Sequence, residues 1–139
     1  MNILVVGGAG LVGGLVLPIV AQQHSLRVFD RQPPADARWE YFAGDVGDLD
    51  ALMAAAAGCD ALLYMAMGHK IYETNLGITS NFDVNVKGVY LALEAARRNS
   101  VPHAVYASSM SVYEYNLEDR RHMAEDLPPD ASGLYGLTK

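Results

Sequence analysis

The sequence has too few cysteine, histidine and basic residues for several classes of protein. Its single cysteine, Cys59, cannot form an internal disulfide or build a cysteine-rich metal site. The four histidines show no spacing typical of metal ligands, so no metal site is predicted. The 10 lysines and arginines face 16 acidic residues, and this net charge of −6 argues against a nucleic-acid partner. The absence of a disulfide framework makes the reducing cytoplasm the expected compartment.

Charged side chains are absent from residues 1–26, and the run from Ile3 to Ala21 is almost wholly apolar. A run of this length can indicate a membrane span or a signal peptide. However, no positive charge precedes it, and five glycines and Pro18 interrupt it. We therefore interpret it as a buried strand, a glycine turn and a buried helix, and we expect no membrane partner. Pro18 should kink that helix or loosen its hydrogen bonding.

The rest of the chain alternates between short apolar runs and segments with helical periodicity. The apolar runs predict strands over Asn2–Val6, Leu26–Phe29, Glu40–Ala43, Ala61–Ala66 and His103–Ala107. The periodic segments predict helices over Leu11–Gln23, Asp48–Ala57, Phe82–Arg98 and from Leu134 to Lys139. Residues 69–80 and the acidic stretch 108–132 are predicted to be irregular. Strands that are apolar throughout and alternate with helices indicate a parallel sheet covered on both faces.

The segment Gly7-Gly8-Ala9-Gly10-Leu11-Val12-Gly13 lies between the first predicted strand and the first predicted helix. In this position Gly7 permits a tight turn, Gly10 lets a pyrophosphate approach the backbone, and Gly13 lets the helix pack on the strand. The N–H groups at the start of the helix would then face the phosphates. A purely structural glycine turn is the alternative. In this context the motif predicts a dinucleotide and a Rossmann-like, doubly wound α/β fold, with one domain over residues 1–139.

Two acidic residues follow later strands and could contact the adenosine half of a dinucleotide. Asp30 ends the second strand, where a carboxylate accepts hydrogen bonds from the ribose hydroxyls and repels a 2′-phosphate. Arg31 beside it could instead accept that phosphate, but the carboxylate favours NAD over NADP. Asp45 and Val46 follow the third strand and could flank the adenine. Alternatively, Asp45 belongs to a solvated loop ahead of a helix capped by Asp48.

These residues resemble the extended short-chain dehydrogenase/reductase superfamily, in its NAD-dependent epimerase/dehydratase branch. The similarity runs along the whole chain and includes the glycine turn and Asp30. Its other marks are Gly44-Asp45-Val46, Leu62 to Met67, Asn85-Val86-Lys87-Gly88, Tyr106 to Tyr113 and Tyr135-Gly136-Leu137-Thr138-Lys139.

The resemblance implies a role for several individual residues. Met65, Ala66 and Met67 would line the cofactor, although the family usually has a small residue in place of Met67. Asn85 would fix the long helix and the active-site geometry, and would belong to the cofactor-binding residues. Ser109, Tyr135 and Lys139 would be catalytic, and the last two would also contact the cofactor.

The chemistry of the Tyr135 and Lys139 pair agrees with that assignment. Side chains four residues apart on a helix share a face, so the ammonium group can favour the phenolate form of the tyrosine. Tyr135 could then remove a proton from a substrate hydroxyl while hydride leaves the carbon that bears this hydroxyl for the nicotinamide. Lys139 would also hold the nicotinamide ribose, and Ser109 would orient the substrate oxygen. A simple surface contact between the two helical side chains is the alternative.

The resemblance therefore implies an enzyme that transfers hydride between NAD and a sugar substrate, either a nucleotide sugar or a sugar acid. Because family members have longer chains, we expect these residues to form an NAD-binding part that lacks the C-terminal substrate domain. On its own this part should be inactive, whereas the full-length form should be a homodimer. A non-catalytic module that senses NAD(P) on the same fold is the alternative function.

Overall fold

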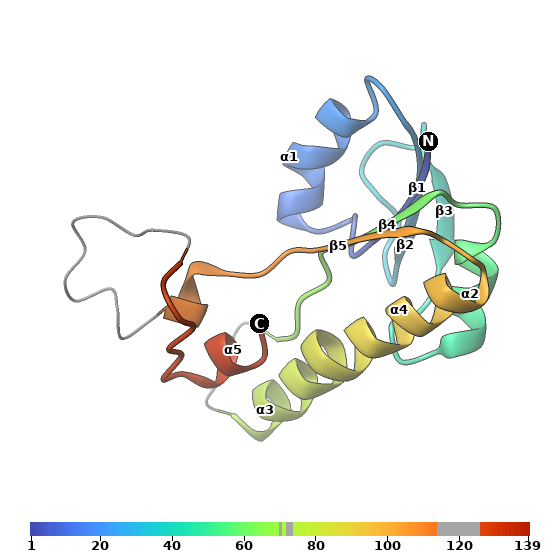
Figure 1. Ribbon diagram of the computed structural model, residues 1–139. Helices are drawn as coiled ribbons and strands as arrows, with labels where there is room; N and C mark the ends of the chain where they lie inside the picture. The colour runs from blue at the N-terminus through green and yellow to red at the C-terminus, as the bar shows by residue number, and fades with distance from the viewer. Residues whose placement is uncertain (70, 72–73, 114–125) are drawn as a thin grey trace.

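The computed structural model, which describes residues 1–69, 71, 74–113 and 126–139, contains a five-stranded sheet in the order β3-β2-β1-β4-β5. The strands are β1 (Asn2–Val6), β2 (Ser25–Asp30), β3 (Glu40–Ala43), β4 (Ala61–Tyr64) and β5 (His103–Tyr106). All neighbouring strands pair in parallel. The order reverses at β1, so a crevice opens there at the carboxyl ends of the strands. The predicted parallel α/β fold is confirmed (Figure 1).

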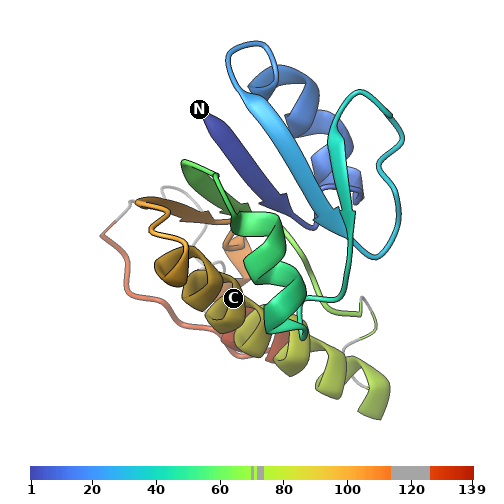
Figure 2. The same cartoon turned by 90° about the vertical axis from the view of Figure 1, so that its right-hand side faces the viewer.

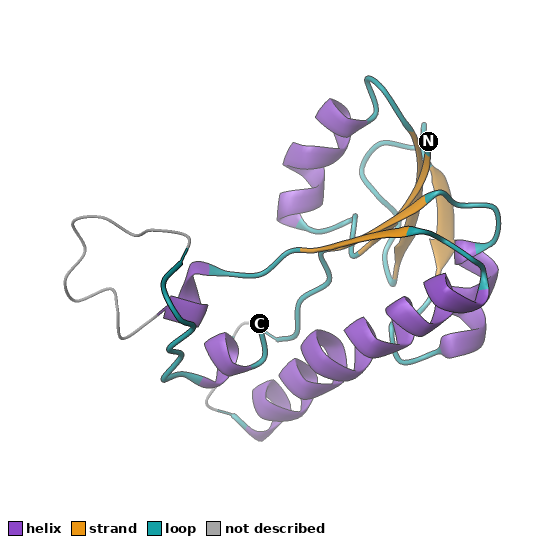
Figure 3. Cartoon of the chain, viewed as in Figure 1, coloured by secondary structure: helices purple, strands orange, loops and turns teal. Residues whose placement is uncertain are grey.

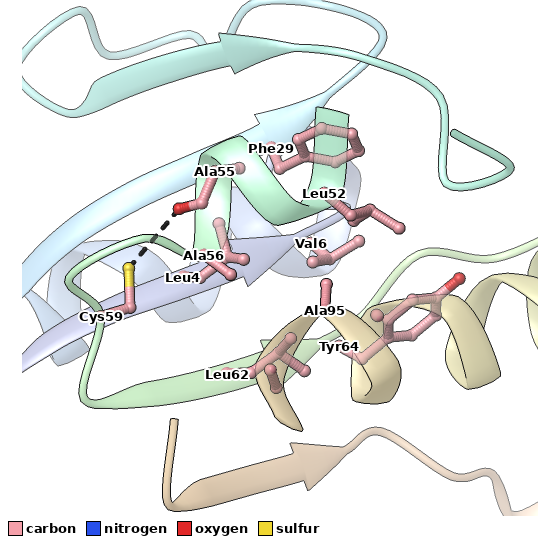
Figure 4. Packing of buried hydrophobic residues seen from close by; sticks show 12 residues of the cluster. Leu4, Val6, Phe29, Leu52, Ala55, Ala56, Cys59, Leu62, Tyr64 and Ala95 are labelled. Atoms are coloured by element: carbon pink, nitrogen blue, oxygen red, sulfur yellow. Dashed lines mark hydrogen bonds between the residues drawn. The ribbon is translucent and has the colours of Figure 1, made fainter. Parts of the chain in front are cut away.

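Helices cover both faces of the sheet (Figures 1 and 2). Helix α1 (Leu11–Val20) packs on one face, while α2 (Leu49–Ala56) and α4 (Val89–Arg98) pack on the other. Because successive side chains of a strand point to opposite faces, β1 contributes to two separate cores. Leu4 and Val6 join α2 and α4 in the larger core shown in Figure 4, and Ile3 and Val5 join α1.

The longest helical segment differs from the prediction at its start. Residues 69–80 were expected to be irregular, but α3 (Asn75–Asn81) leads into a π-helix, η1 (Phe82–Gly88), and then into α4 (Figure 3). Thr74 caps α3 by accepting a hydrogen bond from the Gly77 N–H at 3.0 Å. Threonine, serine, glycine and asparagine have low helix propensity, so the pattern does not reveal this helix before it packs.

Most other boundaries agree with the prediction within a few residues. Helix α2 is capped by Asp48, whose carboxylate accepts from the Ala51 N–H at 3.1 Å, and Gly58 follows it with a φ of +73°. Helix α1 contains Pro18 and ends at Val20, earlier than the predicted Gln23. A short 3₁₀ helix, η2 (Met110–Tyr113), interrupts the predicted acidic loop, and residues 114–125 of that loop lie outside the described residues.

The chain ends in α5 (Leu134–Leu137), whose carboxyl end lies close to the long helical segment (Figure 1). Tyr135 belongs to this helix, whereas Lys139 lies two residues beyond its end, so the helix is shorter than the predicted Leu134–Lys139. None of the helices in the described residues is long and apolar enough to cross a lipid bilayer.

Candidate functional site

A cavity of about 530 Å³ lies at the carboxyl ends of the strands, within the volume range of small-molecule and cofactor sites. Residues that directly follow each of the five strands line it. They are joined by the start of α1, by η1 and by the last residues of the chain. Of the predicted site residues, the following line the cavity: Gly7, Gly10, Leu11, Val12, Gly13, Asp30, Arg31, Asp45, Val46, Met65, Ala66, Met67, Tyr135 and Lys139.

The glycine turn has different requirements at its three motif positions. Gly7 has a φ of +83°, and a Cβ there would overlap the backbone nitrogen of Ala66. A Cβ at Gly13 would overlap the carbonyl oxygen of Gly8. At Gly10, by contrast, the nearest atom to an added Cβ is the Gly7 oxygen at 3.5 Å, an ordinary contact. Protein packing therefore requires glycine at positions 7 and 13. At position 10 the fold would accept a side chain, so the absence of one there leaves space in the cavity that a ligand can occupy.

The carboxylate of Asp30 is held in a fixed orientation at the edge of this turn. Its Oδ2 accepts a hydrogen bond from the Ala9 N–H at 3.0 Å, and its Oδ1 accepts from the Gln32 N–H at 3.2 Å. Each carboxylate oxygen retains further acceptor capacity, so the group can still bind hydroxyls in the cavity. Arg31 and Gln32 line the same end of the cavity, which places a cation beside the acid as the sequence predicts.

Asp45 lies on the wall next to Asp30 and also shapes its own loop. Its Oδ1 accepts from the Gly47 N–H at 2.8 Å, and its carbonyl oxygen accepts from the Asp48 N–H at 2.9 Å. The two interpretations of Asp45 are therefore compatible: it forms the turn ahead of α2 while it and Val46 line the cavity.

Tyr135 and Lys139 line the same cavity as the Asp30 loop, and Lys139 lies against Tyr106 of β5, which β1 and β4 separate from β2 in the sheet. The ammonium of Lys139 lies 4.6 Å from the centre of the Tyr106 ring, a cation–π contact. Burial lowers the pKa of Lys139 because desolvation disfavours its charge. The Ser108 hydroxyl donates to the Lys139 carbonyl oxygen at 3.3 Å, so the end of β5 directly supports the predicted catalytic lysine.

Two predicted site residues do not line the cavity. Ser109 lies just before η2, and its Oγ accepts a hydrogen bond from the Ser111 N–H at 3.2 Å. Its neighbour Ser108 lines the wall instead, so the catalytic role of Ser109 stays a prediction. Asn85 is only 3% exposed and lies in η1, where it bonds to protein groups of the surrounding segments.

Sequence reasoning did not name all the residues that line the cavity. The additional ones are Ala9, Phe29, Gln32, Gly44, Val84, Ala107 and Ser108. Most are chain neighbours of predicted residues, so their position after a strand was an available signal. Val84 follows no strand but directly precedes the predicted Asn85, and it lines the cavity in place of Asn85. The buried hydroxyl of Tyr64 holds this part of η1 by donating to the Val84 carbonyl oxygen at 2.6 Å.

The lining suits a dinucleotide better than a smaller ligand. Asp30 ends β2, Gly10 follows β1 and Lys139 lies against Tyr106 of β5, so these groups follow the strand order β2-β1-β4-β5 across a single cavity. They supply, in that order, acceptors for ribose hydroxyls, space for a pyrophosphate, and a cation with a phenol at the far end. The described residues hold no cluster of histidine, cysteine and acidic side chains suited to a metal ion.

Comparison with known proteins gives a family match and close structural relatives. The model of the NAD dependent epimerase/dehydratase family matches residues 3–139. An N-acetyl-alpha-D-glucosaminyl-diphospho-ditrans,octacis-undecaprenol 4-epimerase of Escherichia coli O157:H7 is 31% identical over 140 residues, covering 99% of this chain and 40% of its own. A uronate dehydrogenase of Agrobacterium fabrum is 31% identical over 141 residues, covering 99% of this chain and 51% of its own.

A solved structure with bound NAD has the same fold. This short-chain dehydrogenase/reductase superfamily protein from Agrobacterium tumefaciens aligns with a TM-score of 0.86 and 34% identity, over 100% of this chain and 42% of its own. The chain spans about two fifths to half of the length of the curated relatives described above.

Proposed function

The chain belongs to the NAD-dependent epimerase/dehydratase family, and from this premise we propose that it is the cofactor-binding part of an enzyme that transfers hydride between NAD and a sugar. One observation carries the proposal. Tyr135 and Lys139 line the same cavity as the glycine turn and Asp30. A module that only binds a dinucleotide has no need for a phenol and an ammonium group at the nicotinamide end of its site.

The residues of the chain would divide the work along the cavity. Asp30 would accept hydrogen bonds from the adenosine ribose, and the backbone around Gly10 would face the pyrophosphate. NAD, when bound, supplies the hydride acceptor or donor. Tyr135 would take the proton from a sugar hydroxyl as the carbon beside it loses hydride, and would return it in the reverse direction. Lys139 would hold the nicotinamide ribose, and Ser109 would hydrogen-bond the reacting oxygen.

Two substrate classes fit this chemistry. One is a sugar carried on a diphosphate, as in a nucleotide sugar, and the E. coli relative acts on a diphosphate-linked sugar by name. The other is a sugar acid, as the name of the Agrobacterium fabrum uronate dehydrogenase indicates. Both classes present a secondary or anomeric hydroxyl on a carbon that can lose hydride. The proposal covers both, and the assay below separates them.

The assay supplies NAD and a panel of nucleotide sugars and hexuronates to the complete enzyme and follows NADH absorbance and product stereochemistry. Net NADH formation with a hexuronate would assign a dehydrogenase, whereas a changed sugar without net NADH would assign an epimerase or dehydratase. Tight NAD binding without turnover of any sugar would instead support the sensor alternative. Failure of NAD to bind would overturn both the enzyme proposal and the sensor alternative.

We extend the proposal to a homodimer of the complete enzyme. Four apolar side chains at helical spacing are partly exposed on the α3–η1–α4 segment: Ile78 (41%), Phe82 (50%), Val86 (46%) and Leu93 (45%). Exposed apolar stripes of this kind favour association. Light scattering should give a dimer for the complete enzyme and a monomer for its Phe82→Glu variant. An unchanged dimer in that variant would place the interface elsewhere.

A further inference from the structure

A chain of buried amides connects α3 to the predicted catalytic segment. Asn81, at the end of α3, is fully buried with 0% exposure, and Asn85 and Thr138 are 3% and 5% exposed. The Asn85 amide nitrogen donates to Asn81 Oδ1 at 2.9 Å and to Thr138 Oγ1 at 3.0 Å. Buried polar groups are costly unless they are hydrogen-bonded, so a network of this kind has to be complete to be stable.

Backbone groups determine the orientation of both amides. The Asn81 nitrogen donates to the carbonyl oxygens of Gly77, at 2.7 Å, and His69, at 3.1 Å. The Asn85 oxygen accepts from the Gly68 N–H at 3.0 Å. A carbonyl can only accept and an N–H can only donate, so neither amide can turn over. Both N–H hydrogens of each amide therefore donate a hydrogen bond. Because the orientation of both amides is fixed, the donor and the acceptor of each bond from Asn81 to Thr138 are fixed as well.

The same network fixes the segment that follows β4. The His69 N–H donates to the Ser80 hydroxyl at 2.9 Å, while its carbonyl accepts from Asn81. A Cβ at Gly68 would lie 2.7 Å from Asn81 Cα, so the absence of a side chain there lets the segment lie directly on the helix. Met67, the residue before it, lines the cavity. Asn81 therefore supports the cavity wall formed by Met67, although Asn81 itself does not line the cavity.

The other end of the network reaches the predicted catalytic pair. The Thr138 hydroxyl, having accepted from Asn85, donates to the Tyr135 carbonyl oxygen at 3.0 Å. The Thr138 carbonyl oxygen accepts from the Tyr106 hydroxyl at 3.4 Å. Thr138 lies between Tyr135 and Lys139 in the chain. Its side chain is hydrogen-bonded to Asn85 and its backbone to Tyr106, so it is held at two points.

We propose that Asn81 is a positioning residue that acts through Asn85 and Thr138 to hold Tyr135 and Lys139 in place. This inference rests on the proposed function for its kinetic consequence, but its structural consequence can be measured without any activity. Asn81 touches neither end of the cavity. Its removal should therefore loosen the segment that carries the phenol and the ammonium, and should lower NAD affinity only modestly, because the glycine turn and Asp30 are untouched.

The test variant is Asn81→Leu in the complete enzyme, and the matched control is Asn99→Leu. Asn99 lies at the other end of the same helical segment, and its amide also donates to two backbone carbonyls, those of Met53 and Ala95, at 3.1 and 3.0 Å. Both variants lose two hydrogen bonds to backbone carbonyls, but only one is linked to Thr138. If Asn81→Leu does not fold, Asn81→Ser replaces it, because the smaller side chain leaves room for a bridging water.

Hydrogen exchange measures the structural consequence directly. We expect faster amide exchange over residues 135–139 in Asn81→Leu and unchanged exchange there in Asn99→Leu. Equal exchange in both variants would overturn the proposal. Hydrogen exchange tests the positioning role even if the wild-type enzyme turns over no sugar. Absence of turnover would refute the proposed function but not the positioning role of Asn81.

Kinetics measure the functional consequence. Misplacement of reacting groups by about 1 Å can lower a rate by roughly 100-fold, so we expect kcat to fall roughly 10- to 100-fold in Asn81→Leu, with a clearly smaller loss of NAD affinity. Thr138→Val should show a similar loss, Thr138→Ser should retain activity, and the Asn81→Leu/Thr138→Val double variant should be no worse than either single one. Losses that multiply would show that Asn81 does not act through Thr138.

Discussion

The carboxylate of Asp30 accepts a hydrogen bond from the backbone N–H of Ala9 at 3.0 Å, which ties the acid at the end of β2 to the glycine turn after β1. The turn and the acid therefore move as one unit. A 2′-phosphate on the ribose would have to lie against a carboxylate that cannot swing away without breaking this bond and the one from Gln32. This relationship gives the predicted preference for NAD over NADP a structural cause.

We predict that the complete enzyme binds NAD more tightly than NADP and that Asp30→Asn narrows the difference. The substitution keeps the shape and one acceptor but removes the charge that repels the phosphate. NADP affinity should rise by roughly tenfold, equivalent to about 1.4 kcal/mol, while NAD affinity falls. Titration calorimetry with both cofactors measures this. Arg31→Ala is the matched control, and a larger effect of that variant on the NAD/NADP ratio would show that Arg31 controls the preference.

Three glycine substitutions should separate cofactor binding from folding. Gly10→Ala should lower NAD affinity by roughly tenfold or more with little change in Tm, because an added Cβ contacts no protein atom closer than 3.5 Å but enters the space for the pyrophosphate. Gly13→Ala should lower Tm, because its Cβ overlaps the Gly8 carbonyl. Gly14→Ala meets nothing within 4 Å and should leave NAD affinity unchanged. A Gly10→Ala protein with wild-type NAD affinity would contradict the assigned pyrophosphate position.

Tyr135→Phe should abolish turnover while leaving NAD affinity almost unchanged. The substitution removes the oxygen that would transfer the proton but keeps the ring on the cavity wall. Loss of general acid–base catalysis lowers rates by roughly 10²–10⁴-fold. Tyr90→Phe, on the exposed face of α4 at 67% exposure, is the control and should retain full activity. Retained turnover in Tyr135→Phe would eliminate this residue as the acid/base group.

Part of this architecture follows from local sequence and part does not. The apolar runs of β1 and β4 and the glycine spacing predicted the sheet, the helices and the cofactor end of the cavity, because those signals depend on neighbours in the chain. Helix α3 was missed because its polar sequence has low helix propensity and the helix is held by hydrogen bonds that Ser80 and Asn81 make to His69, in the segment after β4. Likewise, the sequence indicated Asn85 and not its neighbour Val84, which lines the cavity, since the position of Val84 depends on the hydroxyl of Tyr64.

The pH dependence of turnover should reflect the buried ammonium of Lys139. Burial lowers the pKa of this group, so it loses its positive charge at a lower pH than an exposed lysine, which titrates near ~10.4. Above that pH Lys139 no longer carries the positive charge that the proposed mechanism uses at the acid/base tyrosine, and kcat should fall. Lys139→Arg should move this alkaline limb to higher pH, because a guanidinium does not titrate there. An alkaline limb at the same pH in both proteins would assign it to another group.

The 139-residue chain expressed on its own should self-associate and should not turn over sugars. In the described residues β5 pairs only with β4, so its other edge presents unpaired N–H and C=O groups. Val105 on that strand is 61% exposed, which adds an apolar contact beside the open edge. Such an edge is a template for pairing with a second copy.

Light scattering of the purified chain should therefore show species larger than a monomer, and Val105→Lys should shift them toward smaller species, down to the dimer proposed for the α3–η1–α4 segment, since a lysine on an edge strand opposes pairing. Leu76→Lys is the matched control, because Leu76 is 65% exposed but lies on α3, so this variant should associate like the wild type. Weak NAD binding should persist in all three proteins, because the glycine turn and Asp30 are unchanged. A monomeric wild-type chain with measurable sugar turnover would show instead that these residues suffice for an enzyme.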